Sequence, residues 1–257
     1  MRKDSEKNAL QRDDETLDEL FGGRLRIIQK KKGYRFSIDA VLLAHFARLK
    51  RGERVIDLGA GSGVISIILA LRFPGSGRIT GLELQRPLAD MARRNVMLNR
   101  LGERVDILQG DIRNPSSFLT VKSYDVVVFN PPYRRAGTGR INPDEERALA
   151  RHEIRGSAAD FLQASDRLLR DGGRVYLIYP AKRMVEVLYR MRVLGLEPKN
   201  LRVVHSRTSS EGEFILVEGL KGGGEEVKIL PPLFIYGEEG GYSGEMQGIF
   251  NALPDRP

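Results

Sequence analysis

Short apolar runs alternate with helical patterns through the middle of the sequence, and this alternation restricts the chain to few folds. The apolar runs predict strands at 54–58, 78–82, 105–109, 124–129 and 174–179. The patterns between and after them predict helices at 64–72, 87–101, 158–169 and 183–194. Nearly continuous Val and Ile residues are typical of parallel strands that are covered on both faces. We therefore predict an α/β fold with a mostly parallel sheet.

The two ends of the chain depart from this alternation. Strands at 201–205 and 214–220 have no helix between them, so they should pair as an antiparallel hairpin and complete a seven-stranded sheet. A last strand at 227–236 contains two prolines, which confine it to an edge. Near the start, strands at 24–29 and 34–37 should form a small hairpin around the turn at 30–33. Ser37 should then cap a helix that runs to about 48.

These features divide the chain into four parts. We expect a disordered polar tail at 1–16, the hairpin and helix at 17–50, the main domain at 51–221 and a C-terminal extension at 222–257. The chain has 257 residues of which 41% are hydrophobic, which suffices for one large core.

Composition excludes several kinds of site and compartment. There is no cysteine, so disulfides and Cys-ligated zinc are excluded. The three histidines are scattered without ligand spacing, so we predict no metal. No apolar run approaches the length of a signal peptide or a membrane span, so we expect a cytoplasmic protein without a membrane partner. The sequence leaves the oligomeric state open.

A glycine-rich turn directly follows the first strand of the main domain and opens a helix. It begins with Asp57 and contains Gly59, Gly61 and Gly63, which allow the backbone to approach a ligand closely. The third glycine comes one residue too early for the dinucleotide fingerprint. The carboxylate of Asp57 would repel a pyrophosphate but suits a cationic ligand. S-adenosylmethionine, which carries a sulfonium and an ammonium group, fits this turn, although a purely structural turn is the alternative.

Two further acids follow the next two strands. Glu83 stands about 20 residues beyond the glycines, where a carboxylate can accept hydrogen bonds from both ribose hydroxyls. Asp111 closes the third strand and could accept the amino group of the cofactor's adenine. A solvated acid at a strand end and a helix N-cap are the respective alternatives.

The sequence Asn130-Pro131-Pro132-Tyr133 ends the fourth strand, at the edge where ligands of open α/β sheets bind. The side-chain oxygen of Asn130 and a proline carbonyl can accept both hydrogens of an amino group. Tyr133 can stack on the ring that carries this group. Holding the hydrogens out of the ring plane frees the nitrogen lone pair for attack on a methyl group. We therefore predict that these four residues are catalytic and that Asn130 also lies against the cofactor.

Together, these motifs resemble those of the class I amino-methyltransferases, which act on adenine N6, cytosine N4 or protein glutamine N5. The segments 26–44, 232–236 and 241–245 resemble the bacterial adenine-N6 methyltransferases of a valine tRNA, and the likeness runs from about residue 17 to 248. It implies a Rossmann-like methyltransferase fold and a target adenine beside the anticodon, at tRNA position 37. It also implies that Phe36, Ser37 and Asp39 lie near the methionine end of the cofactor. From the residues alone, this stretch is only a capped helix.

An excess of basic over acidic residues and one strongly basic segment favour an RNA partner. The formal net charge is +8, which favours polyanions through counterion release. The segment 133–155 follows the tetrapeptide, and two glycines should make it mobile. Its candidate phosphate contacts, together with one in the lysine-rich turn, are Arg134, Arg135, Arg140, Arg151 and Lys31. A solvated loop, balanced by acids at 144–146 and 153, is the alternative.

Adenine-N6 methylation of tRNA is the leading hypothesis. Methylation of a protein glutamine, as in a release factor, uses the same tetrapeptide, but its enzymes usually begin with a separate helical domain. Guanine-N2 methylation of ribosomal RNA is a third hypothesis, although its enzymes often have two related domains. A cofactor-binding module without catalysis is disfavoured because the tetrapeptide is intact.

Overall fold

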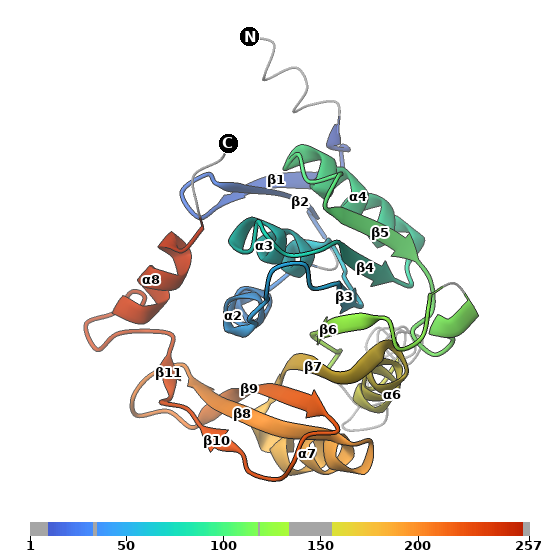
Figure 1. The fold of residues 1–257 in the computed structure, drawn as a ribbon. Helices are drawn as coiled ribbons and strands as arrows, with labels where there is room; N and C mark the ends of the chain where they lie inside the picture. Colours follow the sequence, from blue (N-terminus) through green and yellow to red (C-terminus); the bar gives the residue numbers. More distant parts are fainter. Residues whose placement is uncertain (1–9, 33–34, 118, 134–155, 254–257) are drawn as a thin grey trace, which may run out of the picture.

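The computed structural model describes residues 10–32, 35–117, 119–133 and 156–253. Its centre is a run of parallel strands in the order β5-β4-β3-β6-β7 (Figure 1). The strands are β3 (Val55–Leu58), β4 (Ile79–Glu83), β5 (Val105–Gln109), β6 (Tyr124–Phe129) and β7 (Leu169–Pro180). The predicted strand positions and the parallel order of this part are confirmed.

An antiparallel hairpin completes the sheet, as predicted. Its strands are β8 (Leu196–His205) and β9 (Gly212–Lys221), and β9 lies between β7 and β8. The expected last strand is two short pieces on either side of the prolines, β10 (Lys228–Ile229) and β11 (Leu233–Phe234). Both pair with β8 at the edge of the sheet. The described sheet thus has seven long strands and two short ones.

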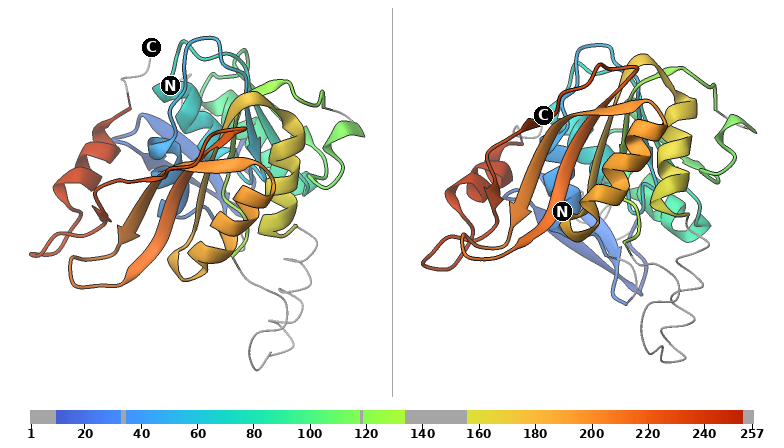
Figure 2. Two further views of the ribbon diagram at one scale, coloured as in Figure 1. Left: turned by 60° about the horizontal axis from the view of Figure 1, so that its bottom comes forward. Right: turned by 90° about the horizontal axis from the view of Figure 1, so that it is seen from below.

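Helices cover both faces of the sheet. One face packs against α2 (Ile38–Phe46), α3 (Val64–Arg72) and α4 (Arg86–Leu98). The other packs against α6 (Ala158–Leu168) and α7 (Met184–Val193), which lie side by side in Figure 2. Within β6, Val126 and Val128 join the first core while Val127 and Phe129 join the second, because successive side chains of a strand alternate. Short 3-10 turns occur at η1 (Pro115–Ser117) and η2 (Ala181–Arg183).

The small N-terminal hairpin exists and β2 (Leu25–Lys30) matches the strand predicted at 24–29, but the strand that pairs with it precedes it in the chain. The hairpin consists of β1 (Glu15–Leu20) and β2, joined by a turn with positive φ at Phe21, Gly22 and Gly23. The prediction of a strand at 34–37 is wrong, because 35–37 form no strand and lead directly into α2. Glu15 and Thr16, which we expected in the disordered tail, belong to β1.

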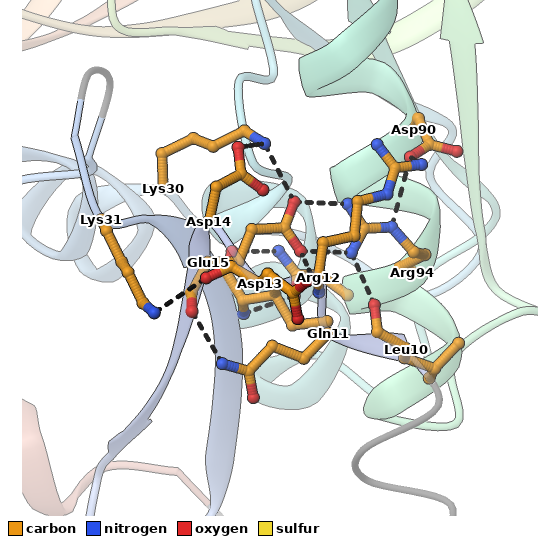
Figure 3. Close-up of polar contacts among 12 residues, drawn as sticks. Leu10, Gln11, Arg12, Asp13, Asp14, Glu15, Lys30, Lys31, Asp90 and Arg94 are labelled. Carbon is orange, nitrogen blue, oxygen red and sulfur yellow. Dashed lines mark hydrogen bonds and ion pairs between the residues drawn. The ribbon is translucent and has the colours of Figure 1, made fainter.

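The hairpin is fixed to α4 by a buried carboxylate, which explains why a polar segment is ordered. The Glu15 side chain is fully buried and accepts two hydrogen bonds from Arg94, at 2.6 and 2.8 Å (Figure 3). Burial alone would raise the pKa of Glu15. The pKa is nevertheless lowered to about 2, because Arg94, the Arg12 amide and Lys30 donate hydrogen bonds to the carboxylate and Arg94 adds its charge. The hairpin therefore contains an ionised, paired acid in its interface with α4.

A second buried side chain connects the hairpin, α4 and the glycine-rich turn. Asn95 of α4 is fully buried, exchanges two hydrogen bonds with the backbone of Ile28 and donates another to the Ser62 carbonyl. All of its polar atoms are therefore satisfied within the protein, as a buried amide requires. Because Ser62 lies between Gly61 and Gly63, the position of the hairpin is coupled to that of the turn.

The C-terminal extension ends in a helix that the sequence did not predict, α8 (Gly244–Asn251). Ser243 caps it, and Met246 and Ile249 reach the first core. The ring of Phe250 lies 5.8 Å from that of Phe21, so α8 packs beside the N-terminal hairpin (Figures 1 and 2). No helix in the described ranges is long and apolar enough to cross a membrane.

Candidate active site

A pocket of about 320 Å³ opens at the carboxyl ends of the parallel strands. This is the edge where ligands of open α/β sheets bind. The structure brings most of the predicted site residues together in its wall, namely Ser37, Asp39, Gly59, Gly61, Glu83, Asp111, Asn130, Pro131, Pro132 and Tyr133. They come from the turns after β3, β4, β5 and β6 and from the start of α2.

The glycine-rich turn needs its glycines for conformation and for space. Gly59, Gly61 and Gly63 have φ values of 71°, 57° and 83°, a region that side chains strain. A Cβ atom at Gly59 would lie 3.0 Å from the Phe161 ring, and one at Gly63 would lie 3.2 Å from the Cβ of Ala92. Gly59 and Gly61 line the pocket, whereas Gly63 packs against α4 and does not.

Glu83 faces the pocket with both carboxylate oxygens fixed. The residue is only 5% exposed. Its Oε2 accepts a hydrogen bond from the Gly61 amide at 2.9 Å, and its Oε1 accepts one from the Gln85 amide at 2.8 Å. A carboxylate oxygen has capacity for more than one hydrogen bond. Glu83 can therefore hold the turn in place and still accept hydroxyl groups of a ligand.

Asp111 lines the pocket beside an arginine. Its carboxylate accepts hydrogen bonds from Arg113, including both oxygens from Nε at 2.9 Å. These hydrogen bonds lower the pKa of Asp111, so it is ionised at neutral pH. It can act as an acceptor for an amino group at the end of the pocket that it shares with Ile112.

Asp57 lies behind the turn and does not line the pocket. It is fully buried, and its Oδ2 accepts hydrogen bonds from the Ser66 amide and hydroxyl at 3.2 and 2.7 Å. Burial raises the pKa of Asp57 to about 7. Its other oxygen has no partner among the described residues. The structure thus gives Asp57 a place beneath the turn, where it joins β3 to α3.

The tetrapeptide after β6 meets the start of α2. Asn130 Nδ2 donates a hydrogen bond to Asp39 Oδ2 at 3.0 Å, and the Tyr133 hydroxyl lies 2.7 Å from the same oxygen. The Tyr133 hydroxyl is also in hydrogen-bonding contact with Asn130 Oδ1. Pro131 and Pro132 lie between these two residues in the pocket wall. The predicted catalytic residues therefore form one connected cluster.

Tyr133 is supported from two strands and one turn behind it. Its ring lies 6.1 Å from the Tyr179 ring and 5.7 Å from the Phe214 ring. Arg183 donates a hydrogen bond to the Tyr133 carbonyl at 3.0 Å and covers the Tyr179 ring at 4.9 Å. These contacts hold the aromatic ring at the wall of the pocket, where a flat ligand ring could stack on it.

Several pocket residues were not predicted from the sequence. Arg35 lines the pocket, whereas its predicted neighbour Phe36 does not. Leu84, Gln85 and Ile112 follow the predicted acids within two positions, so their places in the chain could have indicated them, whereas Leu88 comes from the first turn of α4. Phe161 comes from α6, and no local signal connects it with the pocket.

Of the predicted RNA contacts, the structure describes only Lys31. Arg134, Arg135, Arg140 and Arg151 lie outside the described residues. Lys31 is exposed, and its Nζ donates a hydrogen bond to the Asp13 carbonyl at 2.8 Å. In the described part of the chain, no group of three or more His, Cys, Asp or Glu side chains could hold a metal ion.

Comparisons with known proteins identify relatives of this chain. The methyltransferase small domain family matches residues 37–195. A protein of Aeromonas hydrophila named tRNA1(Val) (adenine(37)-N6)-methyltransferase is 35% identical over 179 residues, which are 70% of this chain and 73% of that protein.

Two solved structures share the fold. A predicted O-methyltransferase of Agrobacterium tumefaciens has a TM-score of 0.68 at 21% identity, covering 84% of this chain and 97% of that one. TYW2 of Pyrococcus horikoshii, solved in complex with MeSAdo, has a TM-score of 0.56 at 16% identity, covering 82% of this chain and 73% of that one. The predicted Rossmann-like methyltransferase fold is therefore confirmed.

Proposed function

The chain belongs to the methyltransferase small domain family, and we propose that it transfers the methyl group of S-adenosylmethionine to N6 of an adenine in tRNA. The observation that carries this proposal is the placement of Asn130 and Tyr133 in one pocket with Glu83 and the glycine-rich turn. The Aeromonas relative narrows the target to adenine 37 of a valine tRNA. We place the protein in the cytoplasm, where it would meet this tRNA.

The volume and the lining residues of the pocket support S-adenosylmethionine as its ligand. A volume of about 320 Å³ lies within the range of small-ligand sites. Glu83 would accept hydrogen bonds from the ribose hydroxyls, and Asp111 would accept one from the amino group of the cofactor's adenine. Leu88, Ile112 and Phe161 provide apolar surface for the flat ring. When bound, the cofactor supplies an electrophilic methyl group on a sulfonium.

Asn130 and Pro131 would prepare the target nitrogen. An exocyclic amine is a weak nucleophile because its lone pair is delocalised into the ring. If Asn130 Oδ1 and the Pro131 carbonyl accept its two hydrogens out of the ring plane, the lone pair becomes available for attack. Tyr133 would stack on the adenine and fix its plane. The nitrogen can lose its proton after the transfer, so the chain needs no strong base.

The test is a transfer assay with tritiated S-adenosylmethionine and two substrates in parallel, an unmodified valine tRNA transcript and a release factor. Products are digested and identified by mass. Label in N6-methyladenosine at position 37 would support the proposal. The Asn130→Ala variant should lose transfer while it retains its affinity for S-adenosylhomocysteine.

The principal alternative is methylation of a protein glutamine, because its amide nitrogen could be held by the same tetrapeptide. Label on a glutamine of the release factor, with none in the tRNA, would keep the site and replace the substrate. Label in N2-methylguanosine when ribosomal RNA is supplied would favour the third hypothesis. If Asn130→Ala turned over at the wild-type rate, Asn130 would have no part in the reaction.

A further inference from the structure

We propose that Asp39 is a positioning residue for the methyl transfer, which orients the Asn130 amide and draws the hydroxyl hydrogen of Tyr133 to itself and away from the amide oxygen. The inference rests on the proposed role of Asn130. It changes the role that family resemblance suggested for Asp39, which was contact with the methionine end of the cofactor.

Asp39 is a buried acid surrounded by neutral donors. It is 5% exposed at the first turn of α2. Its Oδ1 accepts hydrogen bonds from the Ser37 hydroxyl and from the Ala40 amide, while its Oδ2 meets Asn130 and Tyr133. No Lys or Arg of the described residues forms an ion pair with it. Hydrogen bonds to a charged acceptor are about twice as strong as neutral ones, so this carboxylate orders its donors firmly.

The carboxylate determines which way the Asn130 amide faces. Only the NH₂ group of the amide can donate, and it lies 3.0 Å from Asp39 Oδ2. The opposite orientation would bring the amide oxygen against an anion. Asp39 therefore directs the Asn130 oxygen away from itself, and this is the atom that the target amine must reach.

The Tyr133 hydroxyl has one hydrogen, and two acceptors of the described residues lie within hydrogen-bonding distance of it. It contacts both Asp39 Oδ2 and Asn130 Oδ1. If it donates to Asn130, it occupies the oxygen that the target amine needs. If it donates to Asp39, the Asn130 oxygen remains available. A carboxylate is the stronger acceptor, so Asp39 favours the second arrangement.

The test compares Asp39→Asn, Tyr133→Phe and the double variant in the tritiated-methyl assay. Asp39→Asn retains the shape of the side chain but lacks its charge, so Tyr133 would return to the Asn130 oxygen. We expect kcat to fall by about 10- to 100-fold, while the affinity for S-adenosylhomocysteine stays within about threefold. Asp106→Asn, at an exposed acid that pairs with Arg78, is the matched control and should leave kcat unchanged.

The double variant distinguishes positioning from a structural role. Without the Tyr133 hydroxyl, no donor of the described residues competes for the Asn130 oxygen, so Tyr133→Phe should restore kcat of Asp39→Asn by about threefold or more. The proposal would be overturned if the fold-loss of kcat in the double variant equalled the product of the fold-losses in the two single variants. If Asp39→Asn lost much of its affinity for S-adenosylhomocysteine while kcat stayed unchanged, Asp39 would instead be a residue that binds the cofactor. If Asp39→Asn does not fold, the same comparison is made between Asp39→Ser and the double variant of Asp39→Ser with Tyr133→Phe.

A second measurement does not depend on the substrate. The side-chain amide signals of Asn130 can be assigned by nuclear magnetic resonance with Asn130→Ala. In the ligand-free protein, the hydrogen-bonded amide proton should shift upfield in Asp39→Asn and exchange faster with solvent. Unchanged signals would overturn the proposal even if the wild-type protein methylated neither tRNA nor release factor. Absence of methyl transfer by the wild type, with shifted signals, would instead contradict the proposed function alone.

Discussion

Glu83 has two tasks that use the same carboxylate. It holds the Gly61 amide of the glycine-rich turn and faces the pocket where the ribose would bind. An acid in this position can act on the ligand directly and also through the turn. Removing it would therefore take an acceptor from the Gly61 and Gln85 amides as well as from the two ribose hydroxyls.

The first prediction concerns this residue. Glu83→Ala should weaken S-adenosylhomocysteine binding by roughly 1.5–3 kcal/mol, or about 10- to 150-fold, through the loss of a charge-assisted pair. Isothermal calorimetry measures the change, with Asp106→Asn as the control. At saturating cofactor, kcat should change much less than the affinity. Equal affinities of Glu83→Ala and wild type would refute the ribose assignment.

The sequence predicts a site residue well where both the type of its side chain and its position at the end of a strand indicate a ligand site. Glu83 ends β4 and Asn130 directly follows β6, so their residue type and their place at the edge of the sheet indicated the site. The role of Asp57 was not predictable in the same way, because only folding shows that it lies beneath the turn with Ser66. Phe161 reaches the pocket from a distant helix, and no pattern within one segment can report such a contact.

At the level of elements, the N-terminal hairpin depends on one long-range ion pair. Glu15 lies 79 positions before Arg94 in the sequence, yet the two form a buried pair. A short strand of mostly acids and leucines such as β1 does not identify the segment with which it pairs. This is why 34–37 was mistaken for the second strand and why Glu15 was assigned to a disordered tail. The helix α8 was overlooked because its apolar contacts are equally distant.

The second prediction follows from the pKa of Glu15, which falls from 4.5 to about 2 in the folded protein. A lowered pKa of an acid contributes stability that is fully present above about pH 4.5 and is lost as the pH falls towards 2. Glu15→Gln should therefore lower the free energy of unfolding by about 3 kcal/mol at pH 7. The difference from the wild type should shrink between pH 4.5 and 3. Urea denaturation at these pH values measures it.

The matched control is Asp14→Asn, which removes the neighbouring acid. Asp14 pairs with Lys30 but is 67% exposed, so its loss should lower the free energy of unfolding far less than the loss of Glu15 does. A Glu15→Gln effect that stayed constant down to pH 3 would show that the side chain matters for its packing and not for its charge.

At the scale of the whole molecule, the site is assembled where parallel strands end and the hairpin docks. The hairpin is coupled to the glycine-rich turn through Asn95, and its second strand leads to Arg35 at the pocket. Arg35 donates to the Lys30 carbonyl at 3.0 Å, so the lysine-rich turn begins beside the pocket. A polyanion that places a base in the pocket would therefore pass near Lys31.

The third prediction concerns this polyanion and the net charge of +8. Each phosphate that the protein neutralises contributes about −0.7 to −0.9 to the slope of log K against log salt. If about four phosphates are neutralised, tRNA affinity should fall roughly 50- to 150-fold between 50 and 200 mM salt. Fluorescence anisotropy with labelled valine tRNA measures this. Affinity for S-adenosylhomocysteine, which has no phosphate, should change less than about twofold.

Lys31→Ala localises the effect to the lysine-rich turn. If Lys31 contacts a phosphate, the magnitude of the slope should fall by about one and binding should weaken similarly for all tRNAs. The Asp13 carbonyl that Lys31 contacts in the free protein offers only a weak competing bond at the surface. An unchanged slope would remove Lys31 from the interface and direct the search to the arginines between 134 and 155. A tRNA affinity that did not depend on salt would contradict phosphate contacts altogether, because no other source of binding releases counterions in this way.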